Sequence, residues 1–370
     1  MARHVKRSLS TVAWLLMGFS LCAQVKPSPT ITQLKQDAAK AQADGNTETA
    51  LRLYRQILAK TPEWADGWWE YGNLLYDSRR FAEAAQAFGR LSRLAPENPL
   101  GFALLGLSEY EEGDWNNASL HLNKALSARN GMPAPISQSA AYHLGLVLMR
   151  QHNDEGALLA FKILFHQAPD YPGLLLALGS AQLNLEQVPA AGSSLFAAVR
   201  AAGDAAAAIL QNRKKDAEDA YRVLLAQFPA QPFVHLDYGM FLESEHRDEE
   251  ATAEFLAETK TNPESAVPWL WLGRLALDQR VGEEARADAL RARTLNPDDA
   301  LSFLIEGRSF ILDRQWDSAL TALREAEQRA PQSSEVHYAL VSVYMGLHRN
   351  SEAEQERQLF LQTSKSEGER

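Results

Sequence analysis

Carboxylates and histidines are the side chains of this sequence that could bind a cation or carry out acid–base chemistry. Seven of the 47 carboxylates lie in two short clusters, EYEEGD at 109–114 and HRDEE at 246–250, and each cluster lies where two helical patterns meet. His143 and His166 lie singly in helical patterns, where a lone histidine is most often a packing or surface residue. Charged residues at solvated turns account for both clusters, so we predict no metal site.

Motifs that carry catalysis are missing from the sequence. It contains no glycine-rich phosphate loop, no GxSxG elbow, no HExxH and no histidine pair at the spacing of metal ligands on a helix. We therefore predict a protein that is not an enzyme and that has no catalytic residues and no cofactor.

Aromatic residues are concentrated in the stretch WWEYGNLLY, from Trp68 to Tyr76. Such a stretch could stack on a ligand, or it could pack in a core. The choice between these two depends on whether the stretch is unique or is one copy of a repeat.

The charge of the chain limits its partners. The 370 residues carry a formal net charge of -10, and no basic stripe interrupts the acidic balance. Nucleic acids and anionic membrane surfaces attract basic patches, so we predict neither as a partner.

The N-terminus has the pattern of a secretory signal. Basic residues in MARHVKR precede the apolar run STVAWLLMGFSL, and Ala23 is a suitable cleavage point. The run is too short to cross a bilayer, which takes about 20 residues. We predict an exported protein, periplasmic or extracellular, in a bacterial envelope. The alternative is a lipoprotein acylated at Cys22, the only cysteine, but Leu21 fits a lipidation signal poorly.

A period of 34 residues dominates the rest of the chain. Ala50, Tyr54 and Pro62 recur as Ala84, Phe88 and Pro96, and prolines at 263, 297 and 331 follow the same step. A large apolar residue also precedes a glycine once in most units. These glycines are Gly72, Gly106, Gly145, Gly179, Gly239, Gly273 and Gly307.

This pattern resembles the tetratricopeptide repeat family over residues 31 to about 361. In the second unit the match includes Trp68, Tyr71, Gly72, Ala84 and Pro96. The resemblance implies an all-α fold, a right-handed α-solenoid superhelix of about ten stacked helix-turn-helix units. The predicted organisation is a signal peptide (1–23), a linker (24–30), a first array of five units (31–203), a second array of five units with its first unit truncated (204–362), and a polar tail (363–370).

Residues 185–216 break the period. QVPAAGSSLFAAV is a weak helical pattern, because Gly192, Ser193 and Ser194 are poor helix formers. The stretch DAAAAILQNRKK lacks the large residue and the glycine that usually mark a first helix. We expect a bend or a loose joint here.

In this family, positions 5, 9 and 12 of each first helix face a concave groove. Trp68, Tyr71 and Leu75 then form a core stripe, whereas Trp69 and Tyr76 are rotated toward the groove. The candidate partner-binding residues are Trp69, Asn73, Tyr76, Leu107, Tyr110, Tyr142, Met149, Met240, Arg274, Arg308, Tyr338 and Met345.

The resemblance implies a non-catalytic protein–protein interaction scaffold. The predicted groove is apolar and contains several methionines, which suits a peptide or an amphipathic helix of a partner protein. Arg274 and Arg308 could bind a carboxylate, or they could pair with Asp278 and Asp313 of the chain itself. Two alternatives remain open: a membrane-tethered assembly factor of the envelope, held by Cys22 or an uncleaved signal, and a glycan or small-molecule binder with aromatic stacking faces.

Overall fold

The computed structural model describes residues 30–128 and 131–368, and this part of the chain is helical with no strand. The predicted all-α solenoid is confirmed. The predicted signal peptide, Cys22 and nearly all of the linker lie outside the described residues. No helix in the described part is long and apolar enough to span a membrane.

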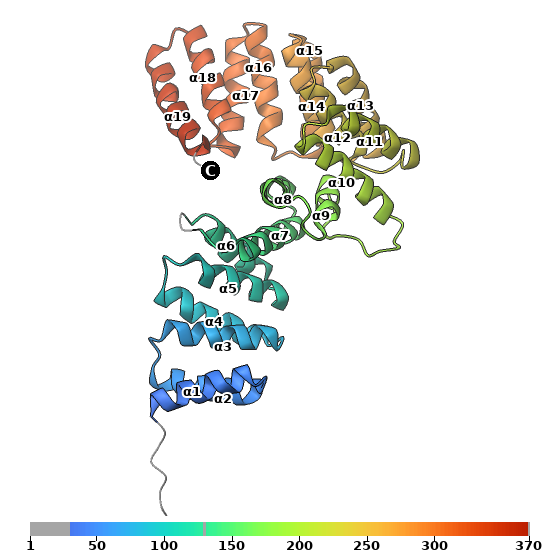
Figure 1. The fold of residues 1–370 in the computed structure, drawn as a ribbon. Coiled ribbons are helices and arrows are strands. Elements are labelled where there is room, and N and C mark those ends of the chain that lie inside the picture. The colour runs from blue at the N-terminus through green and yellow to red at the C-terminus, as the bar shows by residue number, and fades with distance from the viewer. Residues whose placement is uncertain (1–29, 129–130, 369–370) are drawn as a thin grey trace, which may run out of the picture.

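Nineteen helices follow one another within the described residues (Figure 1). They are α1 (Ile31–Ala43), α2 (Thr47–Lys60), α3 (Ala65–Asp77), α4 (Phe81–Leu94), α5 (Pro99–Glu112), α6 (Trp115–Leu126), α7 (Ala134–Arg150), α8 (Asp154–Gln167), α9 (Leu174–Gln182), α10 (Phe196–Leu210), α11 (Lys214–Gln227), α12 (Val234–Ser244), α13 (Asp248–Thr261), α14 (Val267–Asp278), α15 (Gly282–Leu295), α16 (Ala300–Leu312), α17 (Trp316–Arg329), α18 (Ser334–Gly346) and α19 (Asn350–Gly368).

The tight turn inside each helix pair repeats with the period of the sequence. One residue of this turn has left-handed backbone geometry, with positive φ, at Asn212, His246, Arg280, Arg314 and His348. These residues are 34 apart, so the same turn closes five successive pairs. The acidic cluster HRDEE contains one of these turn residues, and EYEEGD contains Gly113, which has φ of 79°. Both clusters therefore lie at turns between helices.

The two helices of a pair meet where a small residue packs against a large one. In the pair α3–α4, a Cβ built on Gly72 would lie 2.6 Å from Cε1 of Phe88, so only glycine leaves room for that ring. Phe88 and Leu75 are fully buried, and each contributes about 1.5–3 kcal/mol through apolar burial. Trp68 is less buried than its place in the core stripe predicts, and it packs edge-on against Tyr71.

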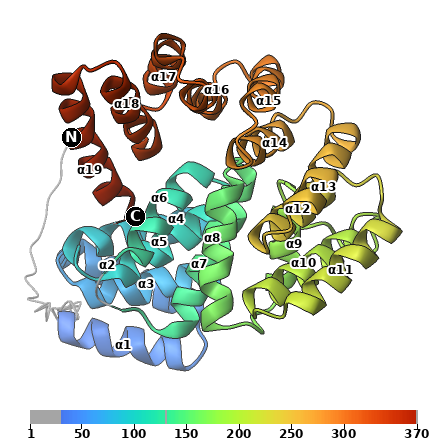
Figure 2. The ribbon, with the colours of Figure 1, turned by 90° about the horizontal axis from the view of Figure 1, so that it is seen from above.

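The pairs stack into a curved ribbon. Substantial packing occurs between helices that are adjacent or next but one in the chain, as expected for a solenoid. Viewed from above, the ribbon curves through most of a turn (Figure 2), and α12, α14, α16 and α18 lie on its inner side while α13, α15, α17 and α19 lie outside. First helices therefore form the concave face in this half of the molecule.

Helix α10 occupies the stretch where the 34-residue period breaks, so the predicted boundary at residue 204 is wrong. The stretch 183–195 forms no α-helix, so α9 lacks the usual partner, and α10 packs against both α9 and α11. Residue 204, the predicted start of the second array, lies in the middle of α10. The truncated unit is the fifth, since the sixth has a complete pair of helices.

The sixth unit was predicted to be truncated because alanine replaces its usual markers. A unit that begins at residue 198 places Ala201 and Ala205 where other units have a large residue and a glycine. Its Pro229 then lies 34 residues before Pro263. The alanine-rich face allows α10 to approach two helices closely, and Gly203 and Gly179 make the contact with α9. A Cβ on Gly203 would clash with the carbonyl oxygen of Leu175, and a Cβ on Gly179 with that of Val199.

Candidate interaction groove

The inner side of the C-terminal half carries the most accessible of the predicted binding residues. Tyr338 and Met345 of α18 are 62% and 61% exposed, unusually high values for large apolar side chains. Arg274 of α14 and Arg308 of α16 are also exposed. Four predicted groove residues, on the first helices α14, α16 and α18, are therefore accessible to a partner.

A groove of about 520 Å³ lies between α16, α18 and α19. Its lining combines the aromatic rings of Tyr338 and Phe360, whose centroids are 5.5 Å apart, with the aliphatic side chains of Ile311 and Leu312. Arg308, Glu335 and Ser342 supply its polar groups. Such a mixture of aromatic walls and few polar groups is typical of peptide-binding surfaces.

Arg308 brings a positive charge without an ion-pair partner among the described residues to this groove. Its expected internal partner, Asp313, instead forms an ion pair with Arg286 at 2.7 Å. Arg308 itself makes no ion pair or hydrogen bond with any described residue. Arg274 lies over the ring of Trp271, 5.1 Å from its centroid, and it too has no acidic partner in the described part of the chain. The pairing of these arginines with Asp278 and Asp313 is therefore wrong.

The predicted groove residues of the N-terminal repeats are less accessible. Trp69, Asn73 and Tyr76 on α3 are half-buried. The ring of Tyr76 packs edge-on against Phe81, with centroids 5.2 Å apart. Burial raises the pKa of Tyr76, and Glu111 and Asp77 add to the effect, so its hydroxyl stays protonated at neutral pH. The aromatic side chains of this stretch thus mainly pack against the core of the solenoid.

Leu107 and Met149 were predicted to face the groove, and this prediction is wrong. Both are buried, and Met149 retains only 1% of its exposed surface, because the neighbouring helices cover these positions. Tyr110 and Tyr142 are half-buried. Tyr110 packs against Trp115 and His143, and Tyr142 packs against Tyr171 at 5.1 Å between ring centroids. These rings fill space between repeats and present little free face for stacking.

Met240 of α12 is half-buried and lines a smaller cavity of about 210 Å³. This cavity lies where α8, α9, α10, α11 and α12 meet, at the irregular unit. It contains Asp237, a buried carboxyl group that the sequence pattern did not single out.

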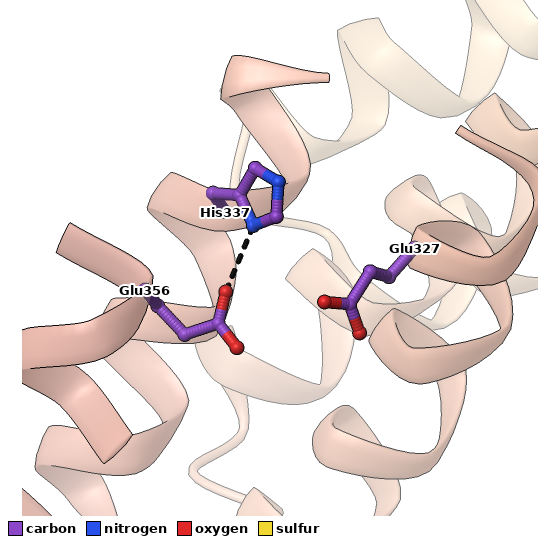
Figure 3. Close-up of side chains that lie close together, drawn as sticks. All are labelled: Glu327, His337 and Glu356. Carbon is purple, nitrogen blue, oxygen red and sulfur yellow. Dashed lines mark hydrogen bonds and ion pairs between the residues drawn. The ribbon is translucent and has the colours of Figure 1, made fainter. Parts of the chain in front are cut away.

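Glu327, His337 and Glu356 come together between the last two repeats, and their ligand atoms lie within 4.8 Å of one another (Figure 3). Nδ1 of His337 is 2.8 Å from Oε2 of Glu356, and Nε2 is 3.1 Å from the carbonyl oxygen of Pro331. Arg324 forms ion pairs with both glutamates. Protein partners thus occupy both ring nitrogens and both carboxylates, which makes this cluster an ion-pair network that joins α17, α18 and α19.

The His–Glu pair of this network also occurs earlier in the chain, and the sequence contains a signal for it. His235 and Glu254 form a pair at 2.6 Å between α12 and α13. In both pairs the glutamate follows the histidine by 19 residues, and the two pairs are 102 residues apart, which is three periods. A search for charged residues in fixed repeat positions would have found them.

The helix pairs and their inner face define a class of protein, the α-solenoid repeat proteins that present a concave binding surface. Residues 40–99 and 104–172 match the family model of the tetratricopeptide repeat. Residues 40–172 therefore carry tetratricopeptide repeats, and helix pairs of the same kind continue through the rest of the described chain.

Solved structures with similar arrangements include a crystal structure of MamA protein, with 17% sequence identity and a TM-score of 0.41, which covers 50% of this chain and 93% of that one. A tetratricopeptide repeat protein from Parabacteroides merdae is 14% identical with a TM-score of 0.36, covering 76% and 98% of the two chains. Yeast Tom70 is 10% identical with a TM-score of 0.36, covering 90% and 91%. No curated protein sequence matches the chain.

Proposed function

We propose that this protein is an exported, non-catalytic scaffold whose C-terminal groove binds an apolar peptide or helix of an envelope protein. The observation that carries the proposal is the groove between α16, α18 and α19, where exposed Tyr338 adjoins the unpaired Arg308. Tyrosine and arginine are the residues most enriched among those that dominate binding energy at protein interfaces.

The chemistry of the groove favours a partner segment with an apolar face and one carboxylate. Tyr338, Phe360 and Ile311 provide apolar contact area, and Met345 extends that area along α18. Arg308 can bind a carboxylate through two parallel hydrogen bonds, and such charge-assisted bonds fix the orientation of the bound segment.

Export rests on the N-terminal pattern of residues 1–23, and we assign the protein to the periplasm or the extracellular side of a bacterial envelope. In this proposal the signal is removed. Fractionation of the native cells, with a Cys22→Ala variant beside the natural chain, tests the route. A protein that leaves the membrane fraction only in the variant would establish the lipoprotein route instead.

Affinity capture tests the groove. The full chain is immobilised, and an envelope extract of the native source is passed over it. We expect one partner to be retained, and its retention to fall at least about tenfold when Arg308→Ala and Tyr338→Ala are combined.

Leu290→Ala is the matched control for this experiment. Leu290 is 56% exposed on the outer helix α15, so its truncation removes a comparable exposed apolar group from the opposite face. Equal retention by the groove variant and the natural chain, or a loss caused by Leu290→Ala, would place the interaction elsewhere. Circular dichroism of each variant verifies that the helices are intact.

A further inference from the structure

The cavity of about 210 Å³ at the irregular unit holds two buried polar atoms without a partner. These atoms are Oε1 of Gln182, on α9, and Oδ2 of Asp237, on α12. Asp237 is only 7% exposed, and its carboxyl group makes no hydrogen bond with any described residue. Because buried polar groups are nearly always hydrogen-bonded, two orphaned acceptors lining one cavity indicate a missing donor.

The other residues that line the cavity supply a third oxygen atom and apolar walls. The hydroxyl of Tyr221 accepts a hydrogen bond from Nε2 of Gln182 at 3.3 Å and adds a third oxygen. Leu178, Leu210 and Phe241 form apolar walls. An apolar cavity of about 150 Å³ is known to hold a molecule as large as benzene, so 210 Å³ can accommodate a short alkyl chain.

Helix α12 holds Asp237 firmly in this position. Glu258 of α13 is fully buried and accepts hydrogen bonds from the backbone N–H groups of Phe233, at 2.7 Å, and Leu236, at 3.3 Å. These bonds fix the first turn of α12, where Phe233 has a left-handed backbone with φ of 72°. The orientation of Asp237 is therefore set by the fold.

We propose that this cavity binds an alkylammonium group, either the side chain of a lysine from a partner protein or a free alkylamine. An ammonium group has three N–H donors, which match the three oxygens of Asp237, Gln182 and Tyr221. A guanidinium group presents five donors in a rigid fork and would leave donors unpaired. An anion would lie against the carboxyl group of Asp237, and the only cation of the lining is Lys162, which is exposed on α8.

The charges around Asp237 make ammonium binding a proton-coupled event. Burial raises the pKa of Asp237 well above its usual value, and Glu258 raises it further while Lys162 lowers it. The empty site therefore favours a neutral carboxyl group. A cation in contact with it favours the carboxylate, so binding releases a proton to the solvent.

A lysine source would make this cavity part of the surface that binds the partner, and in that case the inference rests on the proposed function. Binding of a free amine would not depend on the proposed function.

Calorimetry of the full purified chain at pH 7 tests the site without any partner. The probes are n-butylamine, the blocked amino acid Nα-acetyl-lysine N-methylamide, and 1-butanol as an uncharged molecule with the same carbon chain.

We expect butylammonium to bind at least about tenfold more tightly than butanol, as a charge-assisted hydrogen bond predicts. The measured heat should change with the ionisation enthalpy of the buffer, which reports the released proton. Asp237→Asn should weaken butylammonium binding by a similar factor, while Lys162→Met should strengthen it by removing a competing cation. Tighter binding of the lysine derivative than of butylamine identifies a protein as the source, and the reverse order a free amine.

Three results would overturn the inference: equal binding of butanol and butylammonium, unchanged binding in a folded Asp237→Asn variant, or no binding by either the natural chain or Lys162→Met. None of them bears on the groove between α16, α18 and α19. Loss of partner capture through Arg308 and Tyr338 would still stand, so failure of one proposal is distinguishable from failure of the other.

Discussion

The imidazole of His337 and the carboxylate of Glu356 form a 2.8 Å hydrogen bond in a site where the histidine is only 2% exposed. Nε2 of the same ring is 3.1 Å from the carbonyl oxygen of Pro331, so each ring nitrogen has a partner. Glu356 and Glu327 in turn both form ion pairs with Arg324.

Removal of Glu356 should loosen the last repeat. Glu356→Ala leaves His337 and Arg324 without their shared carboxylate in a buried site, and breaking a buried pair in this way costs about 3–5 kcal/mol. We expect a lower urea midpoint and faster amide exchange in α18 and α19. Glu254→Ala breaks the equivalent but more exposed pair with His235, so its cost should be smaller. Equal costs would show that burial does not govern these pairs.

Asp237 should make the protein less stable as the pH rises. Burial, aided by Glu258, raises the pKa of this carboxyl group well above its usual value in the folded state. The unfolded chain therefore ionises first, and the folded state loses stability from about pH 4 upward, by up to about 1.4 kcal/mol per pH unit. Asp237→Asn should remove this loss. Urea titrations at pH 4 and pH 8 should show similar stability at pH 4 and a more stable variant at pH 8.

Asp288 on α15 should show a milder form of the same behaviour. Burial and the nearby Glu284 raise its pKa to about 6, and Arg291 opposes them. Its contribution to stability is present below about pH 4 and is lost as the pH rises through about 6. A ¹³C NMR titration of the carboxyl carbon should give a midpoint near 6, and Asp288→Asn should be less pH-dependent in this window. A midpoint near 4 would mean that solvent reaches the group freely.

The close approach of α9 and α10 should tolerate no added methyl group. A Cβ at Gly179 or Gly203 would clash with a backbone carbonyl oxygen, which cannot rotate away as a side chain can. We expect Gly179→Ala and Gly203→Ala to lower stability by about 1–3 kcal/mol, the usual cost of overpacking. Gly131→Ala is the control, because nothing lies within 4 Å of its Cβ position. Thermal melts that are alike for the three variants would contradict the packing.

The repeat and its helix pairs were predictable because they depend on a regular spacing of landmarks. The glycine before each turn and the proline after each second helix mark units such as the one containing Gly72 and Pro96. At Ala201 and Ala205 these marker residues are replaced by alanine, so the start of the sixth unit was predicted at the wrong residue. The sixth unit was therefore predicted to be truncated in place of the fifth. Alanine fits either helix of a pair, so its pattern alone does not show which helix it forms.

The groove was predictable only in part. The inner face is set by the first helices, which is why Arg308, Tyr338 and Met345 are accessible as expected. How far each position is covered depends on the packing of the next unit, and this packing buries Met149. The cavity around Asp237 arises where α8 to α12 meet, and its residues are too far apart in the sequence for their proximity to be read from spacing.

In the described part of the chain, substantial packing joins only helices that are near neighbours in the sequence. Tension applied to the two ends of this part would therefore be carried mainly by one interface after another. Each 34-residue unit that detaches and unravels would lengthen the chain by about 110 Å of contour. A partner bound across the inner face would contact several units and make the ribbon stiffer.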